Sequence, residues 1–321
     1  MRWVGFTFKC LLVLGLLPGI TGCPSSSSQQ VIKESESKKI LEGQKQKKQI
    51  KEDEEALKKV PEMTADGYER LGDSFLKKGD IEFAFIQYNK ALNLDPQSIR
   101  VRYKMAGLFL TKGLAEDAQV GFLSIIQEQP DFAPAYDGLG RVFFIKGDLE
   151  QAELNFKQAL RLNPQLWQSH NYLGIIRDKQ KQYDKAVSHY KEAIALRPDI
   201  GLLYNNLGMS YSLQGDYEKA VKAFNEALSK GENDPRINNN LAQALIKLKR
   251  YEEALTVFKL VDQEAAAYFK IGNVYLEDKE YQKAVEAFEK AVDLNPKYDP
   301  KAVEKLKLAR KYLSDSTAKK K

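Results

Sequence analysis

The chain has 321 residues, of which 43% are hydrophobic, and its formal net charge is +6. Residues 301–321 hold eight lysines and arginines against two acids, so the rest of the chain is close to neutral. A near-neutral body argues against a nucleic-acid-binding protein, which would carry a basic face along its fold.

Residues 1–22 have the pattern of a secretory signal peptide. Arg2 and Lys9 make a short positive region, and the apolar run 10–17 is too short to span a bilayer. The sequence Ile-Thr-Gly then precedes Cys23. This ending resembles the lipobox of bacterial lipoproteins, which implies cleavage before Cys23 and a diacylglycerol on its thiol. The other interpretations are an uncleaved membrane anchor or an ordinary signal followed by an unrelated cysteine.

Lipidation of Cys23 leads to expectations about location. Several acyl chains hold a protein firmly on a membrane, because each buried CH₂ contributes about 0.8 kcal/mol. The mature chain would keep no second cysteine for a disulfide. Pro24, in place of an aspartate, favours the periplasm-facing side of a bacterial outer membrane, with the outer face of the cytoplasmic membrane as the alternative. We expect no cofactor other than the covalent lipid on Cys23.

Residues 23–60 are predicted to be the lipidated N-terminus and a charged flexible tether. A serine run is followed by a stretch rich in lysine, glutamate and glutamine, with too few apolar residues to bury much surface. A flexible chain of this length would hold the next domain roughly 35 Å from the membrane on average. The predicted role of this segment is to let the folded domain extend away from the membrane.

Residues 61–298 contain a pattern that recurs every 34 residues, except for a last step of 30. Each unit has a Leu-Gly-like doublet, then a small residue, and an aromatic residue four positions later. Proline closes five of the units. The doublets begin at Leu71, Met105, Leu139, Leu173, Leu207, Leu241 and Ile271. The predicted units are 65–98, 99–132, 133–166, 167–200, 201–234, 235–264 and 265–298.

This pattern resembles the tetratricopeptide repeat, in which each unit is a pair of antiparallel helices. The resemblance implies an all-α, right-handed superhelix (an α-solenoid) of about seven helix hairpins. Small residues let the paired helices approach closely, and a unit buries its apolar face only by stacking on its neighbours. The sixth unit is four residues short, which predicts a tighter turn. Residues 299–321 are predicted to form a capping helix, mainly over 300–313 with Val303 in its apolar stripe, and a basic tail.

Carboxamides gather on the first helices of the later units, which line the concave face in proteins of this family. Carboxamides both donate and accept hydrogen bonds, so they suit a peptide backbone. Asn206 and Asn240 match an asparagine ladder that grips extended chains in some relatives. Alternatively, these asparagines are only tolerated at exposed sites and bind no ligand. Asn238 is expected at the packing edge. The predicted groove residues are Asn171, Asn205, Asn206, Asn239, Asn240, Gln243 and Asn273.

The first helices of the early units carry charged residues where the later units carry carboxamides. Such side chains also face the concave side in the family, so a charged half of that surface precedes a polar, uncharged half. They are Glu69, Asp73, Arg100, Lys104, Asp137 and Arg141.

We find no catalytic pattern. His170 and His189 are the only histidines, and the sequence shows no nucleophile paired with them, no phosphate-binding glycine loop and no Cys/His metal set. An anchor, a tether and a peptide-binding solenoid together predict a non-catalytic protein–protein interaction scaffold in the bacterial envelope.

Two segments, 203–215 and 231–242, are similar to lipoproteins of the TadD family, which act in Tad/Flp pilus assembly. The resemblance implies that the chain assists pilus or secretin assembly, with secretin or pilus components as protein partners, the membrane bound through the lipid, and no nucleic acid. Two alternatives stay open. One is a pilotin of the type IV pilus system, and the other is an adaptor that recruits secretion or cell-wall synthesis enzymes.

Overall fold

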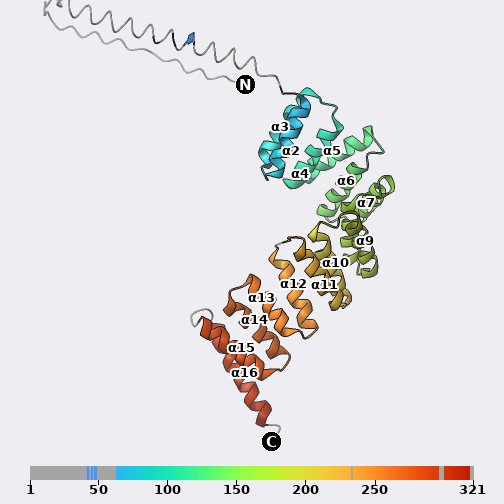
Figure 1. The fold of residues 1–321 in the computed structure, drawn as a ribbon. Coiled ribbons are helices and arrows are strands. Elements are labelled where there is room, and N and C mark those ends of the chain that lie inside the picture. The colour runs from blue at the N-terminus through green and yellow to red at the C-terminus, as the bar shows by residue number, and fades with distance from the viewer. Residues whose placement is uncertain are drawn as a thin grey trace, which may run out of the picture. The chain divides into compact units, whose positions relative to one another are not determined.

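The computed structural model describes residues 63–232, 234–295 and 300–318, together with the isolated positions 42, 45, 47 and 48. The expected signal peptide, Cys23 and nearly all of the expected tether therefore lie outside the described residues. The chain divides into two compact units, 1–63 and 64–321. All the helices described below belong to the second unit (Figure 1).

Every regular element among the described residues is a helix, and the helices come in antiparallel pairs that follow one another along the chain (Figure 1). The fold class predicted from the repeats is confirmed. The seven pairs are α2 (Ala65–Lys77) with α3 (Ile81–Leu94), α4 (Ile99–Thr111) with α5 (Ala115–Glu128), α6 (Ala133–Lys146) with α7 (Leu149–Leu162), α8 (Trp167–Lys179) with α9 (Tyr183–Leu196), α10 (Gly201–Gln214) with α11 (Tyr217–Ser229), α12 (Pro235–Lys247) with α13 (Tyr251–Val261), and α14 (Glu264–Glu277) with α15 (Tyr281–Leu294).

The glycine of the doublet explains how the two helices of a pair pack. A Cβ atom on Gly208 would lie 2.7 Å from the ring of Phe224, and one on Gly72 would lie 2.5 Å from the ring of Tyr88. Both rings are completely buried. The glycine therefore makes room for the aromatic residue of its own unit, and protein interiors are too closely packed to accept an extra carbon there without strain.

Neighbouring units pack through two sets of contacts. The second helix of each unit packs on the first helix of the next, as α5 does on α6 and α9 on α10. First helices of successive units also contact one another directly, in the series α4, α6, α8, α10 and α12. We call the surface of the first helices the inner face and that of the second helices the outer face.

The sixth unit has the tighter turn that its shorter length predicts. Helix α13 has only 11 residues, whereas the other second helices have 13 or 14. Asp262 and Gln263 alone separate α13 from α14. The unit is thus four residues shorter at the end of α13 and in the connection that follows it.

Helix α16 (Pro300–Ala318) packs on α15 and closes the stack. It buries Ala302, Leu306 and Ala309, while Lys301, Lys307 and Lys311 are exposed. The helix is longer than the predicted span 300–313. Val303 is exposed, so its place in the predicted apolar stripe was wrong, and Ala302 packs there instead.

Candidate peptide-binding groove

Two adjoining hollows lie on the inner face between α10 and α12, and they share Met209 and Asn240. Their volumes are about 390 Å³ and about 280 Å³. We call them together the α10–α12 groove. Five of the seven predicted groove residues line it: Asn205, Asn206, Asn239, Asn240 and Gln243.

Apolar side chains alternate with the carboxamides along the groove. Leu202, Met209 and Leu213 are each about half exposed on α10. They lie on the same side of the helix as Asn206, because residues three or four positions apart are neighbours on a helix surface. The groove thus offers apolar contacts and amide hydrogen bonds side by side.

Asn205 carries an acceptor without a partner. Its Oδ1 atom is buried and has no hydrogen-bond partner in the described part of the chain. Its Nδ2 atom makes only long contacts, 3.5 Å to Asn206 Oδ1 and 3.9 Å to Met209 Sδ. A buried acceptor left unpaired costs about 1–3 kcal/mol. An N–H donor bound in the groove would recover that free energy.

Asn171 and Asn206 bond to each other. Asn206 Nδ2 donates to Asn171 Oδ1 at 2.9 Å, and this bond joins α8 to α10. Asn171 is buried, so it supports the groove from behind. Both residues were predicted as ligand contacts, and no pattern in the sequence indicates that one binds the other.

The remaining predicted amides differ in what they contact. Within the described residues, the side chains of Asn239, Asn240 and Gln243 have no hydrogen-bond partner, and Asn239 and Gln243 are exposed. Asn273 lies outside the groove, and its Nδ2 donates to the Phe269 carbonyl of the same helix at 2.9 Å. Asn238 is buried, as expected for a residue at the packing edge.

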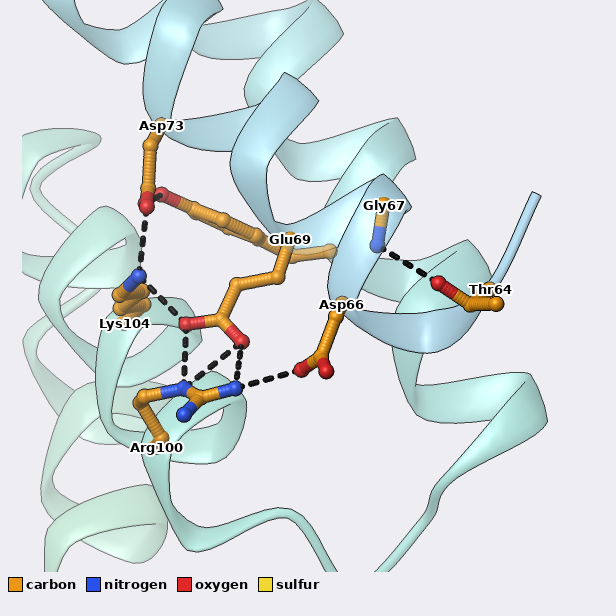
Figure 2. A network of polar contacts seen from close by, with 8 residues as sticks. Thr64, Asp66, Gly67, Glu69, Asp73, Arg100 and Lys104 are labelled. Atoms are coloured by element: carbon orange, nitrogen blue, oxygen red, sulfur yellow. Dashed lines mark hydrogen bonds and ion pairs between the residues drawn. The ribbon is translucent and has the colours of Figure 1, made fainter.

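The charged residues of the first two units bind one another across α2 and α4 (Figure 2). Arg100 Nε donates to both Glu69 oxygens at 2.7 and 2.8 Å, and Lys104 Nζ lies 2.6 Å from Glu69 and 2.7 Å from Asp73. Arg100 also reaches Asp66 at 2.7 Å. These carboxylates and cations are already paired, so they join units and leave little charge for a ligand.

Burial and pairing act in opposite directions on Glu69, which is only 4% exposed. Burial alone would raise its pKa, but hydrogen bonds from Arg100 and Lys104 outweigh that effect and hold the pKa below its ordinary value. Glu69 is therefore ionised at neutral pH and binds both cations.

The third unit also joins its neighbour through an inner carboxylate, but here the partner is a neutral hydroxyl. Asp137 is buried and accepts a hydrogen bond from Ser169 Oγ at 2.6 Å, which links α6 to α8. Burial raises the pKa of Asp137, although Ser169 and the charge of Arg141 oppose the shift. Charged residues of the first three units thus help to hold neighbouring units together.

His170 and His189 lie between α8 and α9, with ring centroids 5.8 Å apart. Burial lowers the pKa of both rings, and that of His189 falls to about 4. Among the described residues, no three or more His, Cys, Asp or Glu side chains are grouped to hold a metal ion. Nor does any helix of the described part have the length and apolar character needed to cross a membrane.

The apolar half of the groove was not predicted from the sequence. Leu202, Met209 and Leu213 read as ordinary residues of an apolar helix. A signal was present, since α10 also buries Leu203, Leu207 and Tyr211 and so is apolar on more than one face. When a helix carries apolar residues outside its core face, those residues stay available for contact with a ligand.

Comparisons with known proteins agree on the repeat. No curated protein sequence matches the chain. A thermophilic TPR protein of Thermus thermophilus is 25% identical, with a TM-score of 0.51 over 57% of this chain and all of that one. A TPR-repeat protein fragment of Cytophaga hutchinsonii is 18% identical, with a TM-score of 0.55 over 74% of this chain and 98% of that one.

The pilF protein of Pseudomonas aeruginosa is 19% identical, with a TM-score of 0.50 over 67% of this chain and 97% of that one. At such identities, the Cytophaga and Pseudomonas structures show the fold alone.

Two family models cover the repeats. Residues 265–298 match the tetratricopeptide repeat model. Residues 32–265 match the model described as the C-terminal domain of cilia and flagella-associated protein 70. Because this second match spans more than half of the sequence, the chain belongs to that family of tetratricopeptide-repeat domains.

Proposed function

We propose that this chain is a non-catalytic scaffold that binds an extended segment of a partner protein in the α10–α12 groove. Proteins built from this repeat bind protein or peptide partners. One observation carries the proposal: the unpaired, buried Oδ1 of Asn205 lies beside a groove lined by further amides. A backbone N–H of the bound segment would donate to that oxygen.

The composition of the groove indicates what segment would fit. Leu202, Met209 and Leu213 favour apolar side chains, and the flexible thioether of methionine adapts to different shapes. Charges lie toward its margins, where Asp234 and Arg236 pair with each other at one side and Lys247 lines the other. The preferred partner segment is therefore extended, uncharged in its centre and rich in apolar residues.

We further propose that the scaffold works in the bacterial envelope, held on the outer membrane by lipid on Cys23, and that it assists pilus or secretin assembly. The support is the lipobox-like sequence before Cys23 and the similarity of segments 203–215 and 231–242 to TadD-family lipoproteins. These segments include most of α10 and the start of α12, the two helices that build the groove.

A crosslinking experiment tests the groove. The full-length chain carries a photoreactive amino acid in place of Met209, and adducts are recovered from irradiated envelopes. Asn205→Ala combined with Asn239→Ala should reduce the adduct about tenfold without loss of helicity, as one or two lost amide contacts imply. Asn273→Ala is the matched control, because Asn273 lies outside the groove. Equal adduct yields in both variants would contradict the proposal.

The identity of the adduct tests the finer role. A secretin or pilus component supports pilus assembly, whereas a secretion or cell-wall synthesis enzyme supports the adaptor alternative. A separate measurement tests the anchor: Cys23→Ser should abolish the incorporation of labelled lipid into the chain. Labelling that persists in this variant would remove the lipid anchor from the proposal.

A further inference from the structure

The chain has only two histidines, and the fold brings them together. His170 lies on α8 and His189 on α9, and their ring planes are inclined by 44° at a centroid distance of 5.8 Å. The equivalent positions of the fifth unit hold Tyr204 and Ala223. Neither histidine lines the α10–α12 groove, so the pair belongs to a separate place in the fourth unit.

His170 takes the place of a tyrosine that ties a first helix to the turn before it. Tyr136 and Tyr204, 34 residues earlier and later, each donate their hydroxyl to a proline carbonyl, at 3.1 Å and 3.3 Å. The ring of His170 likewise forms a hydrogen bond with the backbone of Pro164. Proline has no backbone N–H and offers only its carbonyl as an acceptor, so the ring nitrogen in this bond carries the hydrogen.

The other ring nitrogen of His170 is left without a partner. Its Nδ1 atom is buried and has no hydrogen bond in the part of the chain that the structure describes. Because Nε2 carries the hydrogen, Nδ1 keeps its lone pair free. Histidines that bind a metal ion typically donate one ring N–H to a backbone carbonyl or a carboxylate, and the second nitrogen holds the ion. His170 has this arrangement before any ion is bound.

We propose that His170 and His189 together bind one divalent transition-metal ion, of which Zn²⁺ is the representative, between α8 and α9. Imidazole nitrogen is a preferred ligand of Zn²⁺ and its neighbours in the series. An ion about 2.1 Å from one nitrogen of each ring puts the two centroids about 5.2 Å apart at a tetrahedral angle and about 6.4 Å apart in a straight line. The observed 5.8 Å lies between these limits.

Glu192 supplies a third ligand. It follows His189 by three positions on α9, so the two side chains are neighbours on the helix surface. Its charge acts on both imidazole rings, and within the described residues its carboxylate is exposed and has no ion pair. The described residues contain no preassembled group of three donors, so Glu192 turns inward when the ion binds. Two imidazoles, a carboxylate and a water form a common zinc site.

The surroundings keep the imidazoles in the form that binds metal. Burial lowers the pKa of both rings, and that of His189 falls to about 4, so both are neutral at pH 7. Arg177 is the cation that acts on His189, and two hydrogen bonds of 3.0 and 2.6 Å hold its guanidinium against the carboxylate of Glu153. Neither protons nor an unbalanced positive charge therefore compete strongly with an ion at neutral pH.

Calorimetric titration with ZnCl₂ tests the proposal. The full-length chain is purified without a histidine tag, freed of metal with a chelator, and alkylated at Cys10 and Cys23 so that no thiol binds zinc. It should take up one Zn²⁺ per chain and no Ca²⁺, which prefers oxygen ligands. His170→Tyr is the matched variant, because tyrosine keeps the bond to the Pro164 carbonyl and lacks Nδ1. It should weaken zinc binding at least tenfold, as should His189→Gln.

Two further measurements locate the ion. Glu192→Gln should weaken zinc binding severalfold, whereas Glu226→Gln, at the equivalent position of the fifth unit, should leave it unchanged. Zinc should slow hydrogen exchange in α8 and α9 of the wild-type chain and have no effect in α14 and α15. A wild-type chain that takes up no zinc would refute the site, and so would folded His170→Tyr and His189→Gln variants that bind zinc as tightly as the wild type.

Discussion

The first three units and the last four share one scaffold but use their two faces in opposite ways. In the early units, the inner-face charges already have partners, since Arg100 binds Glu69 and Asp137 accepts a hydrogen bond from Ser169. The outer face of the same units exposes Ile86, Val120 and Leu154. In the later units, the inner face holds the amide-lined α10–α12 groove, and the outer positions equivalent to those three residues are polar (Ser188, Lys222, Thr256 and Glu286). Helix crossings decide the fold, so the exposed positions of each unit are left to specify different contacts.

The largest expected effect tests the shared scaffold. Gly72→Ala in the first unit and Gly208→Ala in the fifth should each lower the free energy of unfolding by about 1–3 kcal/mol, because the added Cβ overlaps a buried ring. Gly107→Ala is the control. Beyond the backbone of its own helix turn, nothing lies within 4 Å of the Cβ it would add, and alanine is the better helix former by roughly 0.8–1 kcal/mol. Thermal melts of the three variants measure these effects. Destabilisation by all three substitutions would contradict the role of the doublet glycine in helix packing.

A smaller effect tests the charged inner face of the early units. Glu69→Gln removes the charge that binds Arg100 and Lys104, and the loss should cost about 1–2 kcal/mol, because Arg100 is largely exposed and solvent offsets part of it. Hydrogen exchange should then speed up in α2 and α3 and stay unchanged in α14 and α15. Uniform acceleration through all units would contradict a local role.

The smallest effect is a pH response confined to the fourth unit. The pKa of His189 is about 4 in the folded chain against 6.5 for the ordinary group, so the unfolded chain binds more protons between these values. The stabilising contribution is present above pH 6.5 and is lost as pH falls toward 4. Burial is the main cause, and His170 and Arg177 add to it against the opposing charges of Glu153 and Glu192.

From pH 7 to pH 5, the free energy of unfolding should fall by about 1 kcal/mol, a value discounted for the partial exposure of the ring. Hydrogen exchange at both pH values should show faster opening of α8 and α9, with α2 and α3 serving as the reference that lacks histidine. His189→Gln should remove most of this difference and leave the smaller part due to His170, whose pKa burial also lowers. A pH response that survives the substitution would assign it to other groups.

The candidate groove was predictable in part. Five of its amides follow from the repeat register, which places Asn205, Asn206, Asn239, Asn240 and Gln243 on the first helices. The pairing of Asn171 with Asn206 and the unpaired Oδ1 of Asn205 did not follow, because both depend on rotamers set by neighbouring helices. Asn273 shows the same limit, since a carboxamide in the same register bonds to its own helix.

The sequence by itself determined the period, the helix pairs and the crossing residues, because these follow from spacings within one unit and from the need for small residues where helices meet. The tertiary structure alone decided which polar side chains are already paired and which are left to bind. Hydrogen-bond partners and burial come from residues about 34 positions away in the neighbouring unit, and local pattern says nothing about their distances.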